Sequence, residues 1–344
     1  MNRYSKKIFF ESFVNTYLYL LITKSGGVVT LREIAGRMGS PTLSSLYYTE
    51  RVSPSSLSEY LSTVDIDPFM MLLQRIVVAV KDKISLHKWS NRHIEIFDTV
   101  YLGVLKRLAD DVSVEVPIRL TLKINAISLL PLDFILDLSN SSDNSVFMAM
   151  VCTLDEGKLF LFDRGFTSLA AMREIAEGGN FFVTRMVSGY KTRVVESLNA
   201  DYVGKTFSVL KLIADELVLV GADDNEGQAT YRRITFEDED DGKKLVFLTN
   251  LVSISPWEVA QLYRLRWIIE ILFRWLKHLL GAIHLISRNW NGIMVQILLT
   301  LVLLALLVML HVMRYGRNKK ISLTGAMRIA ECIVESWIIE IHPP

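Results

Sequence analysis

The sequence has little cysteine and no excess of charge of either sign. Its two cysteines, Cys152 and Cys332, lie far apart without a CxxC motif, which argues against a disulfide framework and a cysteine zinc site and fits a reducing, cytoplasmic setting. Lysine and arginine (38) nearly balance aspartate and glutamate (37), so the net charge of +1 neither demands nor excludes a nucleic-acid partner. The chain also has no internal repeat and no low-complexity tract.

Hydrophobic residues make up 51% of the 344 residues, enough for one large domain or two to three small ones with a substantial core. The first residues, MNRYSKKIFFESFVNTYLYLLI, place basic residues before an apolar stretch. Glu11, Asn15 and Thr16 interrupt that stretch, and no small-residue cleavage site follows. We therefore predict a helix here and not a signal peptide.

One hydrophobic segment is a candidate for a membrane-spanning helix and so argues against a soluble protein. Residues 293–313 are about long enough to span a bilayer, contain no charged Asp, Glu, Lys or Arg, and are followed by the basic RYGRNKK. The segment is solitary, however, and includes Gln296, Thr300 and His311. A helix that is apolar on all sides can equally be the buried spine of a large domain. The context favours the core helix and leaves a membrane anchor as the alternative.

Residues 1–90 have mainly helical patterns. Thr30 with Glu33 three residues later forms a helix-capping sequence, and VSPSSLSEYLSTV contains a second helix start. Basic residues outnumber acidic ones in this part of the chain. Docking on DNA as a helix-turn-helix and plain helical packing both remain open, since short capped helices occur in every kind of protein.

The pattern changes at about residue 92 to short β-type runs. HIEIFDTVYLGVL, PIRLTLKINAISLL and LDFILDLS read as three strands, VFMAMVCTL as a helix and KLFLFDRGF as a strand that enters a turn. After the helix TSLAAMREIAEGG, the runs FFVTRMV, LVLVGA, TYRRITF and KLVFLTNL predict an antiparallel β insertion, with EDEDDG as an exposed hairpin tip.

A well-delimited helix follows, SISPWEVAQLYRLRWIIEILFRWLKHLLG. Ser255 caps it, Pro256 occupies the first helical position, and Glu258 completes a capping box. At about 100° per residue, one polar stripe collects four residues with Arg274 beside them. These four are Tyr263, Arg266, Glu270 and Lys277.

The other sides of this helix are mostly Leu, Ile, Trp and Phe, so we expect it to be buried with its stripe facing a polar site. The alternative is a set of internal ion pairs among Arg266, Glu270 and Arg274. Two aspartates favour the site: Asp98 and Asp163 each follow a hydrophobic strand, and carboxylates at strand ends lie where a site opens.

Together these residues resemble the DDE transposases of the insertion-sequence-four family. The hallmark of that family is Tyr, two residues, Arg, three residues, Glu, six residues, Lys, and YRLRWIIEILFRWLK reproduces it in full. Asp98-Thr99 resembles the first Asp motif, and Asp163-Arg164-Gly165-Phe166 resembles the second. The resemblance covers roughly residues 90–315. Val100 departs from the Asp-Ser-Thr of many relatives, which leaves the metal ligand intact.

The resemblance implies an RNase H-like fold in which Asp98, Asp163 and Glu270 hold two Mg²⁺ or Mn²⁺ ions, hard cations that prefer oxygen ligands. It also implies phosphate contacts by Arg266 and Lys277, with Tyr263 as a hydrogen-bond donor, and Arg274 lies beside them. Phosphate contacts position DNA without reading its sequence. The expected partners are transposon ends and target DNA, and the family forms a homodimer on paired ends.

Charge distribution agrees with a DNA partner, because residues 251–320 hold nine Lys and Arg against two Asp and Glu. Trp267 and Trp275 are expected in the core, while Trp290 lies in a polar turn and can equally stack on an unpaired base. His93, His278 and His284 show no metal-ligand pairing and stay unassigned.

The predicted fold class is α/β: an RNase H-like catalytic core, a mixed sheet flanked by helices, with an antiparallel β insertion and an N-terminal helical region. The predicted domains are a DNA-binding helical region at 1–90, the core at 91–179 and 251–315, the insertion at 180–250 and a C-terminal tail at 316–344. We expect a cytoplasmic, prokaryotic DNA transposase that associates with the nucleoid through DNA. A decayed, non-catalytic DNA-binding relative and the membrane-anchored protein are the alternatives.

Overall fold

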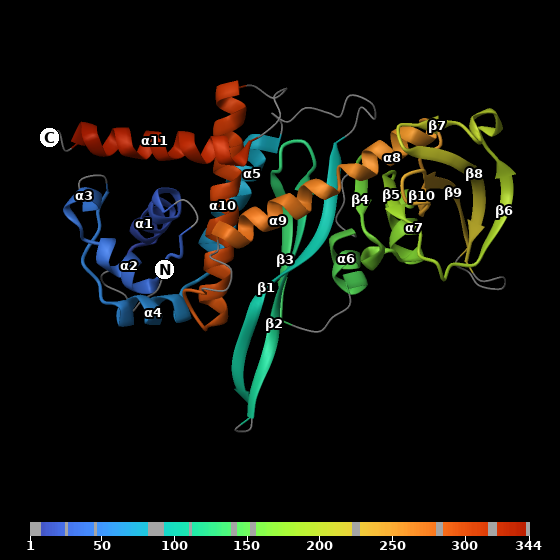
Figure 1. The fold of residues 1–344 in the computed structure, drawn as a ribbon. Coiled ribbons are helices and arrows are strands. Elements are labelled where there is room, and N and C mark those ends of the chain that lie inside the picture. The colour runs from blue at the N-terminus through green and yellow to red at the C-terminus, as the bar shows by residue number, and fades with distance from the viewer. Residues whose placement is uncertain are drawn as a thin grey trace.

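The computed structural model describes most of the chain and places a group of helices beside a long mixed β-sheet (Figure 1). Cys152 and His284 lie outside the described residues. The described residues are 8–24, 27–44, 47–81, 93–109, 112–138, 143–151, 156–221, 228–279, 285–315 and 322–341.

The first five strands form the mixed sheet that was expected. They lie in the order β3-β2-β1-β4-β5, with β1–β2 and β2–β3 antiparallel and β1–β4 and β4–β5 parallel. This arrangement agrees with the predicted RNase H-like core. The strands are β1 (Ile94–Ala109), β2 (Val112–Asn125), β3 (Pro131–Asp137), β4 (Leu159–Phe162) and β5 (Phe181–Arg185).

The predicted antiparallel insertion extends this same sheet. Strand β10 pairs with β5, and β9, β8 and β6 follow in antiparallel order, with β7 paired to β8. The predicted domain boundary at residue 180 falls directly before β5, whose backbone pairs with β4. The strands are β6 (Thr192–Ser197), β7 (Thr206–Phe207), β8 (Leu210–Val220), β9 (Ala229–Asp238) and β10 (Lys244–Thr249).

Alternating side chains give the central strands two buried faces. Ile94 and Ile96 of β1 belong to one core, and Phe97, which follows Ile96, belongs to another, as expected from the two-residue period of a strand. Helices α6 (Asp143–Val151) and α7 (Leu169–Glu177) contribute to the Phe97 core. Helices α8 (Pro256–Arg264) and α9 (Trp267–Leu279) contribute to the Ile94 core, so each face of the sheet is covered by different helices.

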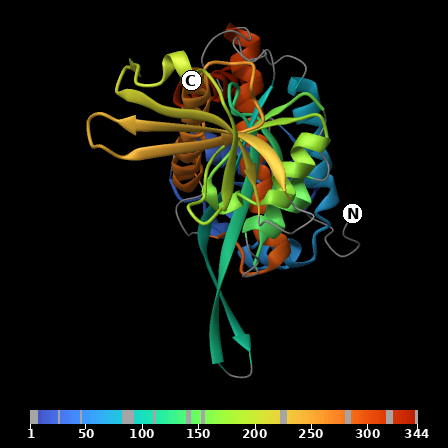
Figure 2. The same ribbon diagram turned by 90° about the vertical axis from the view of Figure 1, so that its right-hand side faces the viewer.

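Strand β1 ends four residues later, and β2 begins five residues earlier, than the runs HIEIFDTVYLGVL and PIRLTLKINAISLL indicated. Their outer halves pair from Gly103–Ile118 to Ala109–Val112 and project away from the rest of the protein as a two-stranded arm (Figures 1 and 2). The expectation that Asp98 ends its strand was therefore wrong. Asp98 lies inside β1, opposite Leu122 of β2, because the strand continues into the arm.

The N-terminal region is helical, as predicted. Thr30 and Glu33 form the expected capping box, and Ser53 caps the second predicted helix start. Aromatic residues Phe13, Tyr17 and Phe69 are fully buried among these helices. The helices are α1 (Phe10–Thr23), α2 (Leu31–Arg37), α3 (Pro41–Ser44), α4 (Pro54–Thr63) and α5 (Asp67–Lys81).

The long apolar segment is helix α10 (Trp290–Tyr315), which is long and apolar enough to cross a membrane. However, 78% of its most apolar 18-residue stretch is buried inside the protein. It packs against α1, α4, α5, β3 and the last helix, α11 (Leu323–Ile341). This burial agrees with the interpretation of the segment as a core helix, around which the N-terminal helices and the sheet are assembled (Figure 1).

Candidate active site

The helix that carries the polar stripe begins as the sequence predicts. The Ser255 side chain accepts the N–H of Glu258, the Glu258 carboxylate accepts the N–H of Ser255, and Pro256 is the first helical residue. The prediction of one continuous helix was wrong, because α8 (Pro256–Arg264) ends before α9 (Trp267–Leu279) begins. Backbone bonds from Leu265 to Leu262 and from Arg266 to Tyr263 tighten the junction into a 3₁₀-type turn.

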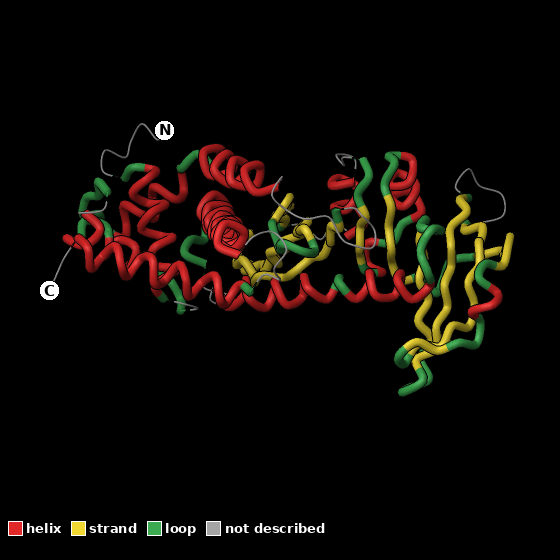
Figure 3. Tube along the Cα trace, turned by 90° about the horizontal axis from the view of Figure 1, so that it is seen from above, coloured by secondary structure: helices red, strands yellow, loops and turns green. Residues whose placement is uncertain are grey.

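The two helices nevertheless form a nearly continuous rod past the strands to the N-terminal helices (Figure 3). Strand geometry turns both aspartates toward this rod. Ile96 of β1 lies beside Leu161 of β4, so Asp98 and Asp163, each two residues farther on, come at the same level. Both share the strand parity of Ile96 and Leu161, whose side chains face the core that includes α8 and α9.

Six of the seven predicted site residues line one open cavity of about 410 Å³. Thr99, Val100, Tyr101 and Phe273 complete its wall. The seventh, Tyr263, lines the neighbouring cavity and reaches the acids from there. The six are Asp98, Asp163, Arg266, Glu270, Arg274 and Lys277.

Arg266 joins two of the three acids. Its Nη1 donates to Asp98 Oδ2 at 3.0 Å and its Nη2 donates to Glu270 Oε1 at 2.7 Å. Tyr263 Oη donates to the third acid, Asp163, at 3.0 Å to Oδ1, and the Tyr263 ring lies 5.8 Å from the Arg266 guanidinium carbon. Tyr263, Arg266 and the three acids therefore form one cluster, in which hydrogen bonds join Arg266 to Asp98 and Glu270 and Tyr263 to Asp163. The contact between the Tyr263 ring and the Arg266 guanidinium links the two groups.

Burial shifts the pKa values of two members of this cluster. It raises the pKa of Asp98 to about 6, and the charges of Asp163 and Glu270 act in the same direction. The Thr99 N–H and the Arg266 charge lower the pKa of Asp98, but they do not offset the burial. Burial also raises the pKa of Tyr263 above its usual value, so its hydroxyl stays protonated and donates to Asp163.

The three carboxylates supply the oxygen ligands that Mg²⁺ and Mn²⁺ prefer. Within the described residues, however, no three His, Cys, Asp or Glu side chains come close enough to hold an ion. Asp98 and Glu270 are bridged by a guanidinium and Asp163 is bonded to Tyr263. The carboxylates fit a hard cation, since two of them already hold the positively charged guanidinium of Arg266. In the present arrangement, however, the acids form an ion-paired cluster and not a metal site.

The sequence reading missed Arg185. Phe162 of β4 pairs with Thr184 of β5, so Arg185 comes level with Asp163 on the neighbouring strand. It lines the same cavity as Tyr263, and its buried Nε has no hydrogen-bond partner among the described residues. The available signal was a basic residue directly after the apolar FFVT run, at the edge where parallel strands end.

Two side chains of α9 contradict the expectation of a buried helix. Trp267, expected in the core, is 56% exposed, and Ile271 one turn later is 50% exposed. Trp275 is half-buried and packs against the core as expected, and Trp290 is also half-buried. Helix α9 therefore has one face on strand β1 of the sheet and another face in solvent.

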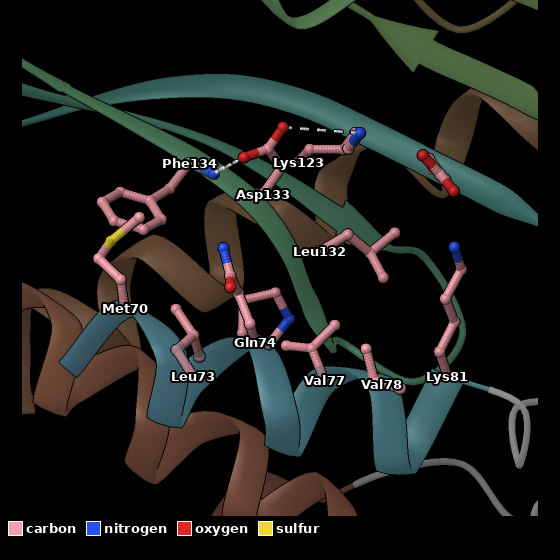
Figure 4. Close-up of a pocket in the computed structure, with 12 residues that line it drawn as sticks. Met70, Leu73, Gln74, Val77, Val78, Lys81, Lys123, Leu132, Asp133 and Phe134 are labelled. Atoms are coloured by element: carbon pink, nitrogen blue, oxygen red, sulfur yellow. Dashed lines mark hydrogen bonds and ion pairs between the residues drawn. The ribbon is translucent and has the colours of Figure 1, made fainter. Parts of the chain in front are cut away.

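A second cavity, of about 280 Å³, lies between α5 and strand β3 (Figure 4). Met70, Leu73 and Val77 form one wall of it, and Leu132 and Phe134 face them. Its charged groups are largely paired: Lys123 lies 3.8 Å from Asp133, and Glu95 lies 3.7 Å from Lys158. This cavity contains none of the predicted site residues.

A fully buried ion pair ties the insertion to the start of α8. Arg232 of β9 donates from Nε and Nη2 to both carboxylate oxygens of Asp215 in β8, at 2.8 and 2.7 Å. Its Nη1 donates to the carbonyl oxygens of Leu251 and Ile254, at 3.1 and 2.7 Å. These two carbonyls belong to the loop before Pro256, so the pair fixes the segment from which α8 begins.

Comparisons with known proteins point in one direction. Residues 117–307 match the family model described as the transposase DDE domain, a segment that includes Asp163 and Glu270 and begins after Asp98. The chain is 29% identical over 174 residues to a protein of Sinorhizobium fredii named as transposase y4zB, covering 50% of this chain and 48% of that protein. The chain thus spans about half the length of that relative.

Two further comparisons agree. A Synechocystis protein named as a transposase for insertion sequence element IS4SA is 23% identical over 259 residues, covering 72% of this chain and 69% of that protein. The structure of a piggyBac transposase synaptic complex with hairpin DNA aligns over 99% of this chain and 74% of that chain, with 10% identity and a TM-score of 0.54. That likeness supports the RNase H-like fold. Because the family model matches more than half of the chain, this protein belongs to the family of the transposase DDE domain.

Proposed function

We propose that this protein is a DNA transposase that cuts the ends of its insertion sequence and joins the 3′ hydroxyl to target DNA. The observation that carries the proposal is the convergence of Asp98, Asp163 and Glu270, from two adjacent strands and one helix, in a single open cavity. Arg266, Arg274 and Lys277 line the same cavity, so acids for metal and cations for phosphate lie side by side.

Each residue has a proposed part. Asp98, Asp163 and Glu270 would hold Mg²⁺ or Mn²⁺, which when bound activates a water or 3′ hydroxyl and stabilises the leaving oxygen. Lys277 and Arg274, both exposed at the cavity wall, bind backbone phosphates and orient the scissile bond. Tyr263 holds Asp163 in place through its hydroxyl.

The proposed partners are transposon-end DNA and target DNA, with a homodimer bridging two ends. The proposed location is the cytoplasm, at the nucleoid. The burial of α10 among α1, α4, α5 and α11 supports a protein that works without a membrane anchor.

The test is cleavage of labelled duplexes that carry the terminal repeats of the element, with Mg²⁺ or Mn²⁺ and with chelator. We expect metal-dependent cutting by the wild type and none by Asp98→Ala, Asp163→Ala or Glu270→Ala, each with DNA binding largely retained. Asp133→Ala is a matched control, because Asp133 is a carboxylate of the same sheet that lines the other cavity.

Full cutting by any one of the three Ala variants would overturn the assignment of the site. Binding of the duplex without metal-dependent cutting by the wild type would instead favour a decayed, DNA-binding relative. The cluster of Tyr263, Arg266 and the three acids argues against decay, because the three acids, Arg266, Arg274 and Lys277 all line one cavity and Tyr263 bonds Asp163.

A further inference from the structure

Arg266 lies between two acids of the site, Asp98 and Glu270. Its two terminal nitrogens bond Asp98 and Glu270 at 3.0 and 2.7 Å, so one guanidinium spans a strand and a helix. The side chain is only 13% exposed, and the Asp98 side chain is 17% exposed. In such surroundings a cation between two carboxylates offsets their mutual repulsion, as a bound metal ion would.

This bridge also explains why the acids are not gathered for a metal. Asp98 and Glu270 each direct an oxygen to Arg266, whereas Asp163 directs one to Tyr263. Accordingly, no three His, Cys, Asp or Glu side chains within the described residues are grouped closely enough to hold an ion. The protein's own hydrogen-bond donors thus occupy carboxylate oxygens that a metal would need.

One further feature indicates that the bridge is not the best position for Arg266. Its Nε is buried and has no hydrogen-bond partner among the described residues. A buried donor without an acceptor is unfavourable, and a phosphate group can accept from several N–H groups of a guanidinium at once. A phosphate would therefore offer the Arg266 Nε an acceptor that the present arrangement lacks.

We infer that Arg266 is an internal counter-ion that competes with the divalent metal for Asp98 and Glu270. The metal binds this pair only after the guanidinium has left it, and the released guanidinium binds a DNA phosphate. This inference rests on the proposed function, because it takes the three acids as the metal site. Its consequence is cooperativity: DNA that draws Arg266 away strengthens metal binding, and metal strengthens DNA binding by the same factor.

The first experiment measures Mn²⁺ binding to the full chain without DNA, by electron paramagnetic resonance of the free ion. The variants are Arg266→Gln, which removes the bridge, and Arg274→Gln, which removes one positive charge from the same cavity. Within the described residues, Arg274 makes no ion pair with any of the three acids. We expect Arg266→Gln to tighten Mn²⁺ binding by about ten- to a hundredfold and Arg274→Gln by much less.

The melting temperature is a second measurement, which distinguishes a change in metal binding from poor folding of the variant. Without metal, Arg266→Gln leaves the acids without their counter-ion, so it should melt at a lower temperature than the wild type. Added Mn²⁺ should then raise its melting temperature by more than it raises that of the wild type. Arg266→Lys, which keeps the charge but not the two-pronged bridge, should lie between the two in both measurements.

The third arm repeats the Mn²⁺ titration on a short duplex. Here the advantage of Arg266→Gln over the wild type should shrink, because DNA has already drawn Arg266 from the acids. A difference that is the same with and without the duplex would show that the released guanidinium does not go to phosphate.

The outcomes separate the two proposals. Weaker or equal Mn²⁺ binding by Arg266→Gln, or an equal gain in Arg274→Gln, would overturn the counter-ion inference while leaving the metal site intact. If instead Asp98→Ala and Glu270→Ala bind Mn²⁺ as well as the wild type, the acids are not the metal site and the proposed function fails with the inference.

Discussion

The buried pair of Arg232 and Asp215 offers the sharpest test of how the fold supports the site. Both side chains are completely inaccessible to solvent. Substitution of Arg232 by Met would leave the Asp215 carboxylate buried, with the Asn199 amide, at 2.7 Å, as its one remaining side-chain donor in the described part of the chain. It would also leave the carbonyls of Leu251 and Ile254 without the donor that now reaches both.

The expected loss follows from these contacts. Breaking a buried ion pair by removing one partner costs about 3–5 kcal/mol of unfolding free energy. The neighbouring pair of Arg233 and Glu216 is a matched control, because it joins the same two strands but leaves 22% and 19% of the side chains exposed. Arg233→Met should cost only about 1 kcal/mol, since solvent screens the pair.

Urea unfolding of the metal-free chain, followed by circular dichroism, measures both losses. The double variant Asp215→Leu with Arg232→Met should recover part of the stability, because no charge is then left unpaired, but not all of it, because the two carbonyls still lack a donor. Equal losses for Arg232→Met and Arg233→Met would refute the reasoning, as would a double variant less stable than Arg232→Met alone.

Three further predictions follow from single features. Burial raises the pKa of Asp98 to about 6, and Mn²⁺ binds the ionised carboxylate. The affinity for Mn²⁺ without DNA should therefore rise by about tenfold per pH unit up to pH 6 and level off above. Competition titrations between about pH 5 and pH 7 measure this, and an affinity that does not change with pH would contradict it. Gly39→Ala should destabilise the protein to urea by about 1–3 kcal/mol, because φ is +75° and a Cβ would lie 2.5 Å from the Arg51 nitrogen. Gly36→Ala is its control and should be neutral or stabilising, since nothing lies within 4 Å. Because α10 is buried, the chain should be recovered without detergent, and retention in the membrane pellet after alkaline wash would reverse that reading.

Local patterns in the sequence were sufficient for the elements that depend on near neighbours. The capping boxes at Thr30 and Ser255 formed as predicted, because a cap needs only residues three positions apart. The spacing of Arg266, Glu270 and Lys277 likewise placed them in one cavity, because helical periodicity is local. The end of a strand is less local, and Asp98 proved to lie inside β1 because pairing with β2 continues into the arm.

Only the tertiary structure decided which distant groups meet. The sequence by itself determined the two aspartates, the polar stripe and the apolar helix, but not that Arg266 would bridge Asp98 to Glu270, that Arg185 would lie level with Asp163, or that Trp267 would face solvent. Whether residues 290–315 enter a membrane or a core was also open in the sequence, because hydropathy is the same in both cases. The packing of α1, α4, α5, strand β3 and α11 around this apolar helix favours the core, since burial depends on partners that no local pattern specifies.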